Sequence, residues 1–162
     1  MEAKPVSASR SIISIVAMSR DANQYGNVFG GMIMGLVDQA AFTAAIRHAR
    51  TPAVVTVSVD HLTFLRPVRV GDVIIVKASV NYVGTTSMEV GVRVETERLS
   101  TGEEEHVVSA YLTMVALDQD GKPTPVPPLL LENDLDHCRH AAAQQRRKLR
   151  MQIVGRKCTP LK

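Results

Sequence analysis

The segment NVFGGMIMGLVD, residues 27–38, combines side-chain and backbone groups that could polarise and attack a carbonyl. Asn27 supplies an amide donor, and Asp38 supplies a carboxylate that can act as a general base or as a nucleophile. Gly30 and Gly31 open a predicted helix, where free N–H groups and the helix dipole can stabilise an oxyanion. Together these groups are typical of a site for acyl transfer or hydrolysis.

The element that must position these groups is a helix predicted from about Gly31 to Arg50. Its apolar residues recur at spacings of three and four, which predicts a buried helix carrying Asp38 as a buried acid. At a rise of about 1.5 Å per residue, Gly31 and Asp38 are about 10 Å apart along the axis. We therefore expect two copies of the chain to share each site, with Asn27 and Gly31 of one copy facing Asp38 of the other.

Most of the domain outside this helix is predicted to form β-strands. Val, Ile, Thr and aromatic residues, with turn residues between the segments, predict mostly antiparallel strands over 11–19, 53–65, 73–83, 87–99 and 105–117. In the second of these strands the apolar side changes face, which predicts a β-bulge near Asp60 or His61. One long helix and about five strands indicate an α+β fold in which the sheet wraps the helix.

The composition fits a single domain, because 162 residues lie within the usual range of about 100 to 200. We predict a flexible N-terminus over 1–10, the domain over 11–121, and a Pro-rich connector with a basic C-terminal helix or tail over 122–162. No apolar run approaches the roughly 20 residues that span a bilayer, and no signal-peptide pattern precedes the domain. A cytoplasmic location without membrane association is therefore predicted, with Cys138 and Cys158 as free thiols.

Three blocks of sequence, in the same order, resemble the cytosolic acyl-coenzyme A hydrolases, a family of hotdog-fold thioesterases. The blocks are DANQYGNVFGGMIMGLVDQAA (21–41), TVSVDHLTFLRPVRVGD (56–72) and NYVGTTSMEVGVRVE (81–95). The resemblance runs from about Ile12 to Leu117. It implies a hotdog fold that hydrolyses acyl-coenzyme A to a carboxylic acid and coenzyme A. It also implies a homodimer with its site at the interface, within a trimer of dimers.

The resemblance also implies roles for particular residues. The family's catalytic Asn and Asp fall on Asn27 and Asp38, and the backbone at Gly31 is expected to polarise the thioester. No metal and no cofactor are expected, apart from coenzyme A as ligand and product. Arg69 is a further candidate for phosphate contact. The residues expected to contact the substrate or its coenzyme A are Phe29, Gly30, Arg66, Gly84, Thr85, Thr86 and Ser87.

The C-terminal segment differs in charge from the rest of the chain. Residues 134–162 hold eight Lys or Arg against two Asp, whereas residues 1–133 hold eleven basic and fourteen acidic side chains. A helix is predicted from about Asp134 to Arg150, with Asn133 as its cap. Its basic run is usually a solvated face, although it could attract the nucleotide of coenzyme A. Nucleic acid is not expected, because no aromatic residues interleave with these charges.

Two other interpretations remain open. One is a non-catalytic acyl-coenzyme A-binding hotdog module whose basic tail contacts a partner, and the other is an oligomeric scaffold without a ligand. The presence of both Asn27 and Asp38 favours the enzyme. The sequence has no GxSxG elbow and no GxxxxGK loop, which disfavours a serine hydrolase and a P-loop nucleotidase. The Asp-x4-His spacing of hotdog hydratases is also absent, which favours hydrolysis over hydration.

Overall fold

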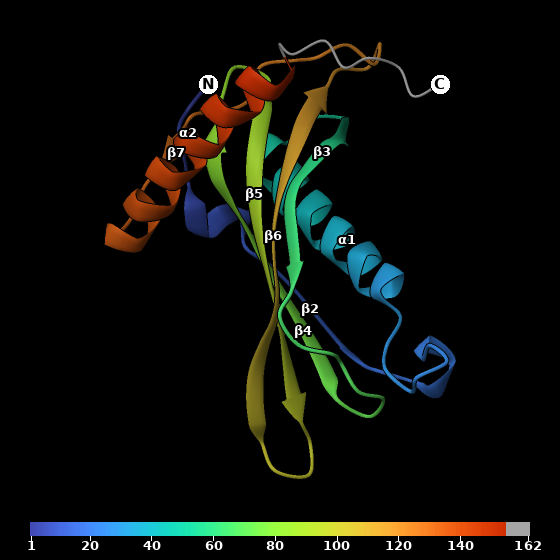
Figure 1. Cartoon of the computed structure of the whole chain (residues 1–162). Coiled ribbons are helices and arrows are strands. Elements are labelled where there is room, and N and C mark those ends of the chain that lie inside the picture. The colour runs from blue at the N-terminus through green and yellow to red at the C-terminus, as the bar shows by residue number, and fades with distance from the viewer. Residues whose placement is uncertain (155–162) are drawn as a thin grey trace.

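A computed structural model describes residues 1–154 and contains one antiparallel five-stranded sheet with a helix on each side (Figure 1). The strands pair in the order β2-β4-β5-β6-β3, so β2 and β3 are the outer strands. Helix α1 spans Gly30–Ala49 and α2 spans Asp134–Val154. The bounds of the strands are Ser11–Val16 for β2, Ala53–Phe64 for β3, Val73–Val83 for β4, Ser87–Arg98 for β5 and Glu103–Leu117 for β6.

The predicted α+β arrangement is confirmed, with element ends that differ from the expected ones by a few residues. Helix α1 ends where Arg50 adopts a left-handed conformation with φ of 54°. The pairing of β3 with β6 shifts register between Thr56 and Ser58 and again between Val59 and His61. The second shift is the β-bulge predicted near Asp60 or His61. Without this bulge, the alternation of side chains along β3 would turn the apolar residues after it to the opposite face of the sheet.

The main core lies between α1 and one face of the sheet. The buried stripe of α1 consists largely of alanines, which allow the helix to lie close to the strands. His48, near the end of α1, is fully buried, and its Nε2 lies 2.9 Å from the carbonyl oxygen of Pro127. The residues of α1 in this core are Ile33, Val37, Ala40, Ala41, Ala44, Ala45 and Ala49.

The N-terminal residues are packed against the domain, so the prediction of a flexible segment over 1–10 is corrected for residues 4–9. Strand β1 (Lys4–Pro5) pairs in parallel with β7 (Leu129–Leu130), and a 3₁₀ helix, η1, follows over Val6–Ser9. Both Val6 and Ser9 are buried, and the Ser9 hydroxyl accepts a hydrogen bond from the backbone N–H of Val80.

Helix α2 lies on the face of the sheet opposite to α1 (Figure 1). The predicted cap is confirmed, since the N–H of Asp136 donates to Oδ1 of Asn133 at 3.0 Å. The helix continues four residues beyond the expected end at Arg150. No helix within residues 1–154 combines the length and apolarity that a membrane span requires. Cys138 is an exposed free thiol, and Cys158 lies outside the described residues.

Candidate active site

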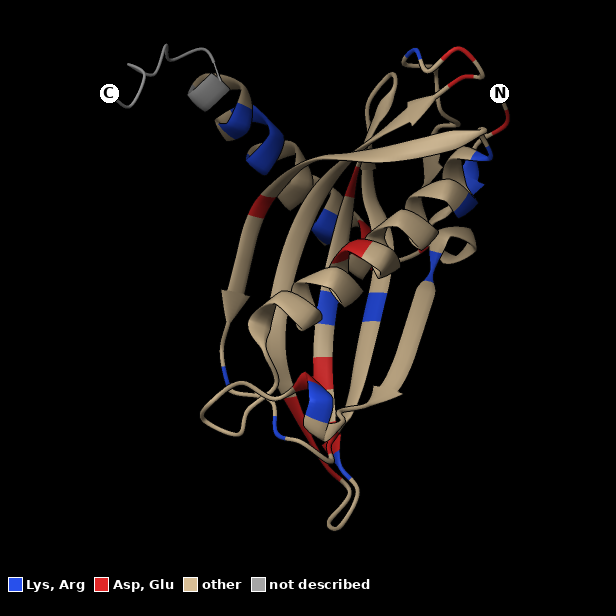
Figure 2. Ribbon diagram, turned by 90° about the vertical axis from the view of Figure 1, so that its right-hand side faces the viewer, with Lys and Arg blue, Asp and Glu red and all other residues tan. Residues whose placement is uncertain are grey.

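Asp38 lies in the middle of α1 and is the only acidic residue of that helix (Figure 2). Its Oδ1 accepts a hydrogen bond of 2.6 Å from the hydroxyl of Thr56 in β3. The expectation that Asp38 is buried is wrong for the isolated chain, in which the residue is exposed. The reason is helical geometry, because the buried stripe passes through Val37 and Ala41 and leaves position 38 at its border.

Thr56 is a site residue that the sequence analysis did not identify as a contact of Asp38. Its hydroxyl donates to one oxygen of the carboxylate and so holds the carboxylate in one orientation. The other oxygen has no hydrogen-bond donor within residues 1–154 and is available to a water molecule or a substrate. A threonine near the start of a strand carries no sequence signal of such a contact, which depends on how α1 crosses β3.

A hollow of about 540 Å³ lies beside Asp38. Its volume falls within the range of roughly 300 to 1,000 Å³ that is usual for small-molecule sites. Apolar side chains form much of its wall, and the carboxylate is its only charged group. The lining residues are Ile13, Asp38, Gln39, Phe42, Thr43, Val54, Val55 and Thr56.

The same hollow borders an open edge of the sheet. Strand β3 is an outer strand, so the N–H and C=O groups along one of its sides have no partner strand. Val55, Val57 and Val59 alternate along it and are all exposed, Val57 by 61%. A twelve-residue outer strand with exposed valines along it is a surface that a second protein strand could cover.

The loop before α1 is organised by Asn23. Its Oδ1 accepts hydrogen bonds from the backbone N–H groups of Tyr25 and Asn27, at 2.9 and 3.2 Å. Its own N–H donates to the carbonyl of Asn27, and Gly26 completes the turn with φ of 79°. The side-chain NH₂ groups of Asn23 and Asn27 have no acceptor among the residues described. Either amide could therefore donate a hydrogen bond to a ligand.

The start of α1 combines free backbone donors with two exposed aromatic rings. A Cβ at Gly31 would lie 2.6 Å from Cε1 of Phe29, and one at Gly30 would lie 3.3 Å from Cζ of Phe64. The glycines therefore leave space for these rings beside the helix start. The first N–H groups of α1 have no acceptor within the helix and could receive the oxygen of a polarised carbonyl.

The turn between β4 and β5 contains the predicted coenzyme A contacts at 84–87. Its backbone is closed by a hydrogen bond of 2.7 Å from the N–H of Gly84 to the carbonyl of Ser87. Ser87 is in register with Val115 of β6, and Val115 is in register with Val55 of β3. Two interstrand spacings therefore place this turn about 10 Å from the part of β3 next to Asp38.

Within one chain, the predicted site residues do not all meet. No hydrogen bond joins Asp38 to Asn27 or Gly31 in the described part of the chain, as the helical spacing predicts. Arg66 is exposed and lies 3.9 Å from Glu105, and the backbone of Arg69 pairs with Asn27. Residues 1–154 also contain no cluster of three or more His, Cys, Asp or Glu side chains placed to hold a metal ion.

The interpretation of the α2 basic run as a solvated face is wrong for two of its residues, Arg146 and Arg150. Arg146 forms a bidentate ion pair with Glu89, which is only 2% exposed, and its guanidinium lies 3.7 Å from the centroid of the Tyr111 ring. Arg150 pairs with Asp60. The outer face of the sheet thus presents a carboxylate to each of these two arginines, whereas the basic residues after 154 lie outside the described residues.

Comparison with known proteins identifies the family. The family model described as thioesterase superfamily matches residues 25–103. The uncharacterized acyl-CoA thioester hydrolase YkhA of Bacillus subtilis is 42% identical over 126 residues, which cover 78% of this chain and 73% of that protein. This chain belongs to the thioesterase superfamily.

Solved structures of acyl-CoA thioesterases are similar to this thioesterase-superfamily chain over nearly its whole length. The crystal structure of an apo-hexameric acyl-CoA thioesterase matches with a TM-score of 0.93 and 35% identity, over 97% of this chain and 100% of that chain. An acyl-CoA hydrolase of Staphylococcus aureus, solved with butyryl coenzyme A, coenzyme A and coenzyme A disulfide, matches with a TM-score of 0.86 and 35% identity, over 92% and 90% of the two chains. The expected hotdog fold is confirmed.

The S. aureus enzyme has also been solved as three alanine variants, of one aspartate, one asparagine and one threonine. That asparagine and that aspartate lie fifteen positions apart in their chain. Fifteen positions also separate Asn23 from Asp38 here, whereas eleven separate Asn27 from Asp38. Asn23 stands in the first block of resemblance, but the sequence analysis did not single it out.

Proposed function

We propose that this protein is an acyl-coenzyme A thioesterase, which hydrolyses acyl-coenzyme A to a carboxylic acid and coenzyme A without a metal. The observation that carries the proposal is the carboxylate of Asp38, oriented by Thr56 at 2.6 Å and placed at the border of an apolar hollow. An acid in such a place can activate a water molecule, and the hollow can accept acyl carbon atoms.

The chemistry needs a base or nucleophile on one side of the thioester carbonyl and hydrogen-bond donors on the other. As a general base, Asp38 takes a proton from the attacking water and returns it to the departing sulfur of coenzyme A. As a nucleophile, its carboxylate oxygen attacks the thioester carbonyl, the C–S bond breaks to release coenzyme A as its thiolate, and water then hydrolyses the acyl-enzyme anhydride to the carboxylic acid and free Asp38. In either route the negative charge that develops on the carbonyl oxygen is stabilised by the N–H groups at Gly31 and by an asparagine amide.

A second copy of the chain supplies the donors that lie too far from Asp38 within one chain. The open β3 edge supports a dimer, because strand pairing across it would cover Val57 and its neighbours. Each dimer would then have two equivalent sites. The hexameric relative supports a trimer of dimers as the complete assembly.

The amide donor has two candidates in the loop before α1. Asn27 was expected from the sequence, and Asn23 is supported by its fifteen-residue separation from Asp38. We favour Asn23, because the bonds to its Oδ1 hold its side chain in one orientation. Coenzyme A is proposed to bind along the helix start and the β4–β5 turn. Its contacts would be Phe29, Gly30, Arg66, Gly84, Thr85, Thr86 and Ser87.

The test is release of coenzyme A thiol from short, medium and long acyl-coenzyme A esters by the wild type and by Asp38→Asn. The substitution keeps the shape of the side chain and removes its basicity, so turnover should fall by at least about a hundredfold. Asp120→Asn, which changes an exposed acid in the turn after β6, should leave turnover unchanged. Activity of Asp38→Asn within tenfold of the wild type would remove Asp38 from the mechanism. Binding of the esters without thiol release by the wild type would favour a non-catalytic binding module.

A further inference from the structure

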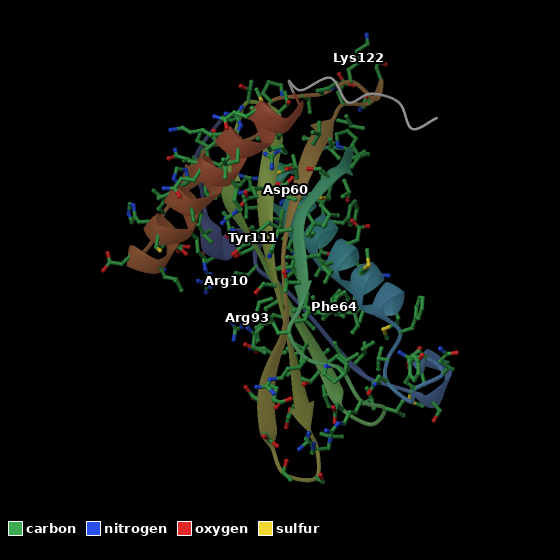
Figure 3. All side chains as sticks on the ribbon, in the orientation of Figure 1. Arg10, Asp60, Phe64, Arg93, Tyr111 and Lys122 are labelled. Carbon is green, nitrogen blue, oxygen red and sulfur yellow. The ribbon has the colours of Figure 1, made fainter. Side chains whose placement is uncertain are left out.

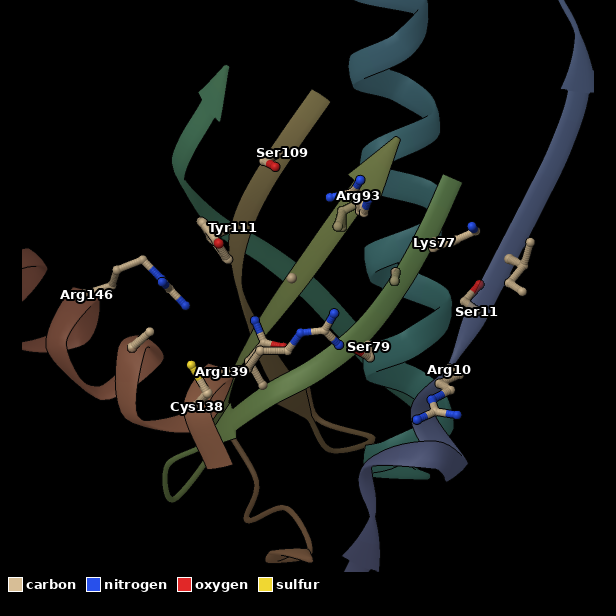
Figure 4. A pocket seen from close by; sticks show the side chains of 16 residues that line it. Arg10, Ser11, Lys77, Ser79, Arg93, Ser109, Tyr111, Cys138, Arg139 and Arg146 are labelled. Carbon is tan, nitrogen blue, oxygen red and sulfur yellow. The ribbon is translucent and has the colours of Figure 1, made fainter. Parts of the chain in front are cut away.

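A second pocket lies on the other side of the sheet, beneath α2 (Figure 4). Its volume is about 490 Å³, and its walls come from α2, from β2, β4, β5 and β6, and from Arg10 at the end of η1. None of its lining residues lines the hollow beside Asp38. The strands therefore separate the two cavities, and nothing in the proposed thioesterase chemistry uses this one.

The wall of this pocket is strongly cationic. Five basic side chains line it, and no carboxylate does. Figure 4 shows Arg139 and Arg146 reaching from α2 toward the strands, with Arg10 on the side of the pocket away from α2. The five are Arg10, Lys77, Arg93, Arg139 and Arg146.

Pairing neutralises only part of this charge. Lys77 and Arg93 share the carboxylate of Glu95, whose pKa lies below its usual range because the hydrogen bonds from these two side chains favour the charged form. Arg146 is paired with Glu89. Arg10 and Arg139 form no ion pair with any residue in 1–154. Five cations against two carboxylates leave the pocket with a net charge of about +3.

The floor of the pocket adds an uncharged donor without a partner. Asn81 is 5% exposed, lines the pocket, and makes no side-chain hydrogen bond within the described residues. Its amide lies against Gly91 on the neighbouring strand, where any Cβ would overlap Nδ2 of Asn81. The glycine therefore leaves the space that this amide occupies. A buried amide that lacks a protein partner is satisfied by a ligand or by water.

We propose that this pocket binds a small anion that bears phosphate groups, at a site separate from the thioester site. Guanidinium and ammonium groups on three sides match the several oxygens of a phosphate group, and the Asn81 amide adds a neutral donor. The Tyr111 ring holds the Arg146 guanidinium in place, which reduces the entropy lost on binding. The cavity volume suits a small molecule rather than a macromolecule.

The test is calorimetric titration of the full-length protein with inorganic pyrophosphate at low ionic strength. The wild type should bind it, and affinity should fall as salt is added, because the attraction is between opposite charges. The double variant Arg10→Gln, Arg139→Gln removes the two unpaired cations without breaking an ion pair, so its Kd should rise at least about tenfold. Lys122→Gln removes a single positive charge from a turn far from Arg10 and Arg93 (Figure 3) and should change Kd less than twofold.

Turnover of acyl-coenzyme A in the absence of pyrophosphate should be the same in the double variant and the wild type, because neither arginine belongs to the proposed active site. Absence of pyrophosphate binding by the wild type would overturn the proposal, and so would equal binding by the double variant. A third arm titrates coenzyme A into protein saturated with pyrophosphate. If coenzyme A displaces pyrophosphate and also loses affinity in the double variant, the pocket holds substrate phosphates and the claim of a separate site fails.

Discussion

The two faces of the sheet are made by alternate residues of the same strands, yet they are covered in different ways. On β5, Val90, Val92 and Val94 are buried toward α1, whereas Arg93 and Glu95 face the other side. The alanine-rich stripe of α1 covers the first face by close apolar packing. Helix α2 covers the second face through ion pairs, with a cationic pocket between.

Substitutions on the two faces are therefore expected to change different properties of the protein. On the α1 face, Asp38 and Thr56 lie at an open border, where substitution removes few internal contacts. On the α2 face, Glu89 and Arg146 are held in a largely desolvated pair, where loss of one partner leaves the other without compensation. We expect variants of the first face to change activity or assembly and variants of the second to change stability.

The largest expected effect is on the open edge of β3. Val57→Asp places a charge on each side of the proposed dimer interface, so the protein should become monomeric and lose the donors contributed by the second copy. Thioester hydrolysis should then fall by at least about a hundredfold, as expected for loss of oxyanion stabilisation. Light scattering after gel filtration measures the assembly. Leu99→Asp, an exposed apolar residue in the β5–β6 hairpin, should leave both properties unchanged, and an assembled, active Val57→Asp would contradict the shared site.

The second prediction distinguishes the two asparagines of the loop before α1. Asn23→Asp keeps the oxygen that accepts the backbone bonds of the loop but removes the NH₂ donor. Its kcat should fall by about a hundredfold, whereas Asn27→Asp, which carries the same charge change, should lose less than about tenfold. Steady-state kinetics with one acyl-coenzyme A ester decides between them. The reverse order of effects would return the amide role to Asn27.

The third prediction concerns the α2 face. Glu89→Gln removes the negative charge that compensates Arg146, so the free energy of unfolding should fall by about 2 kcal/mol. Urea denaturation at one protein concentration measures the loss, with the exposed Glu104→Gln as control. Activity per folded molecule should stay within twofold of the wild type. A normal stability with lost activity would contradict the division of roles between the faces.

The smallest effect concerns pH and the buried His48 at the end of α1. Burial lowers the pKa of His48, and its Nδ1 has no hydrogen-bond partner among residues 1–154, so the folded protein resists protonation there. The unfolded chain takes up the proton near pH 6.5, so this residue makes stability fall as pH decreases below that value, by at most about 1.4 kcal/mol per pH unit. Denaturation of His48→Gln between pH 7.5 and 5.5 should have a smaller slope than that of the wild type. Equal slopes would exclude His48 as the cause.

Most of the fold was predictable because its elements follow local rules. The strand now seen at Val73–Val83 was predicted at the same bounds, and the register shift near His61 was predicted from the change of apolar face. The ordered structure of the N-terminal segment was not predicted, because the two-residue strand and the single 3₁₀ turn over residues 4–9 are too short to give a sequence pattern. They are ordered by contacts with partners distant in sequence, such as β7 and Val80.

The sequence by itself determined the α+β architecture, the family and the importance of Asp38, because periodicity, turn residues and ordered blocks are properties of the chain. Only the tertiary structure decided what surrounds Asp38, since the Thr56 hydroxyl reaches it across eighteen positions through the crossing of α1 and β3. It also decided that Arg146 meets Glu89, fifty-seven positions away. Sequence shows how many charges a chain carries, but their partners depend on which faces pack together.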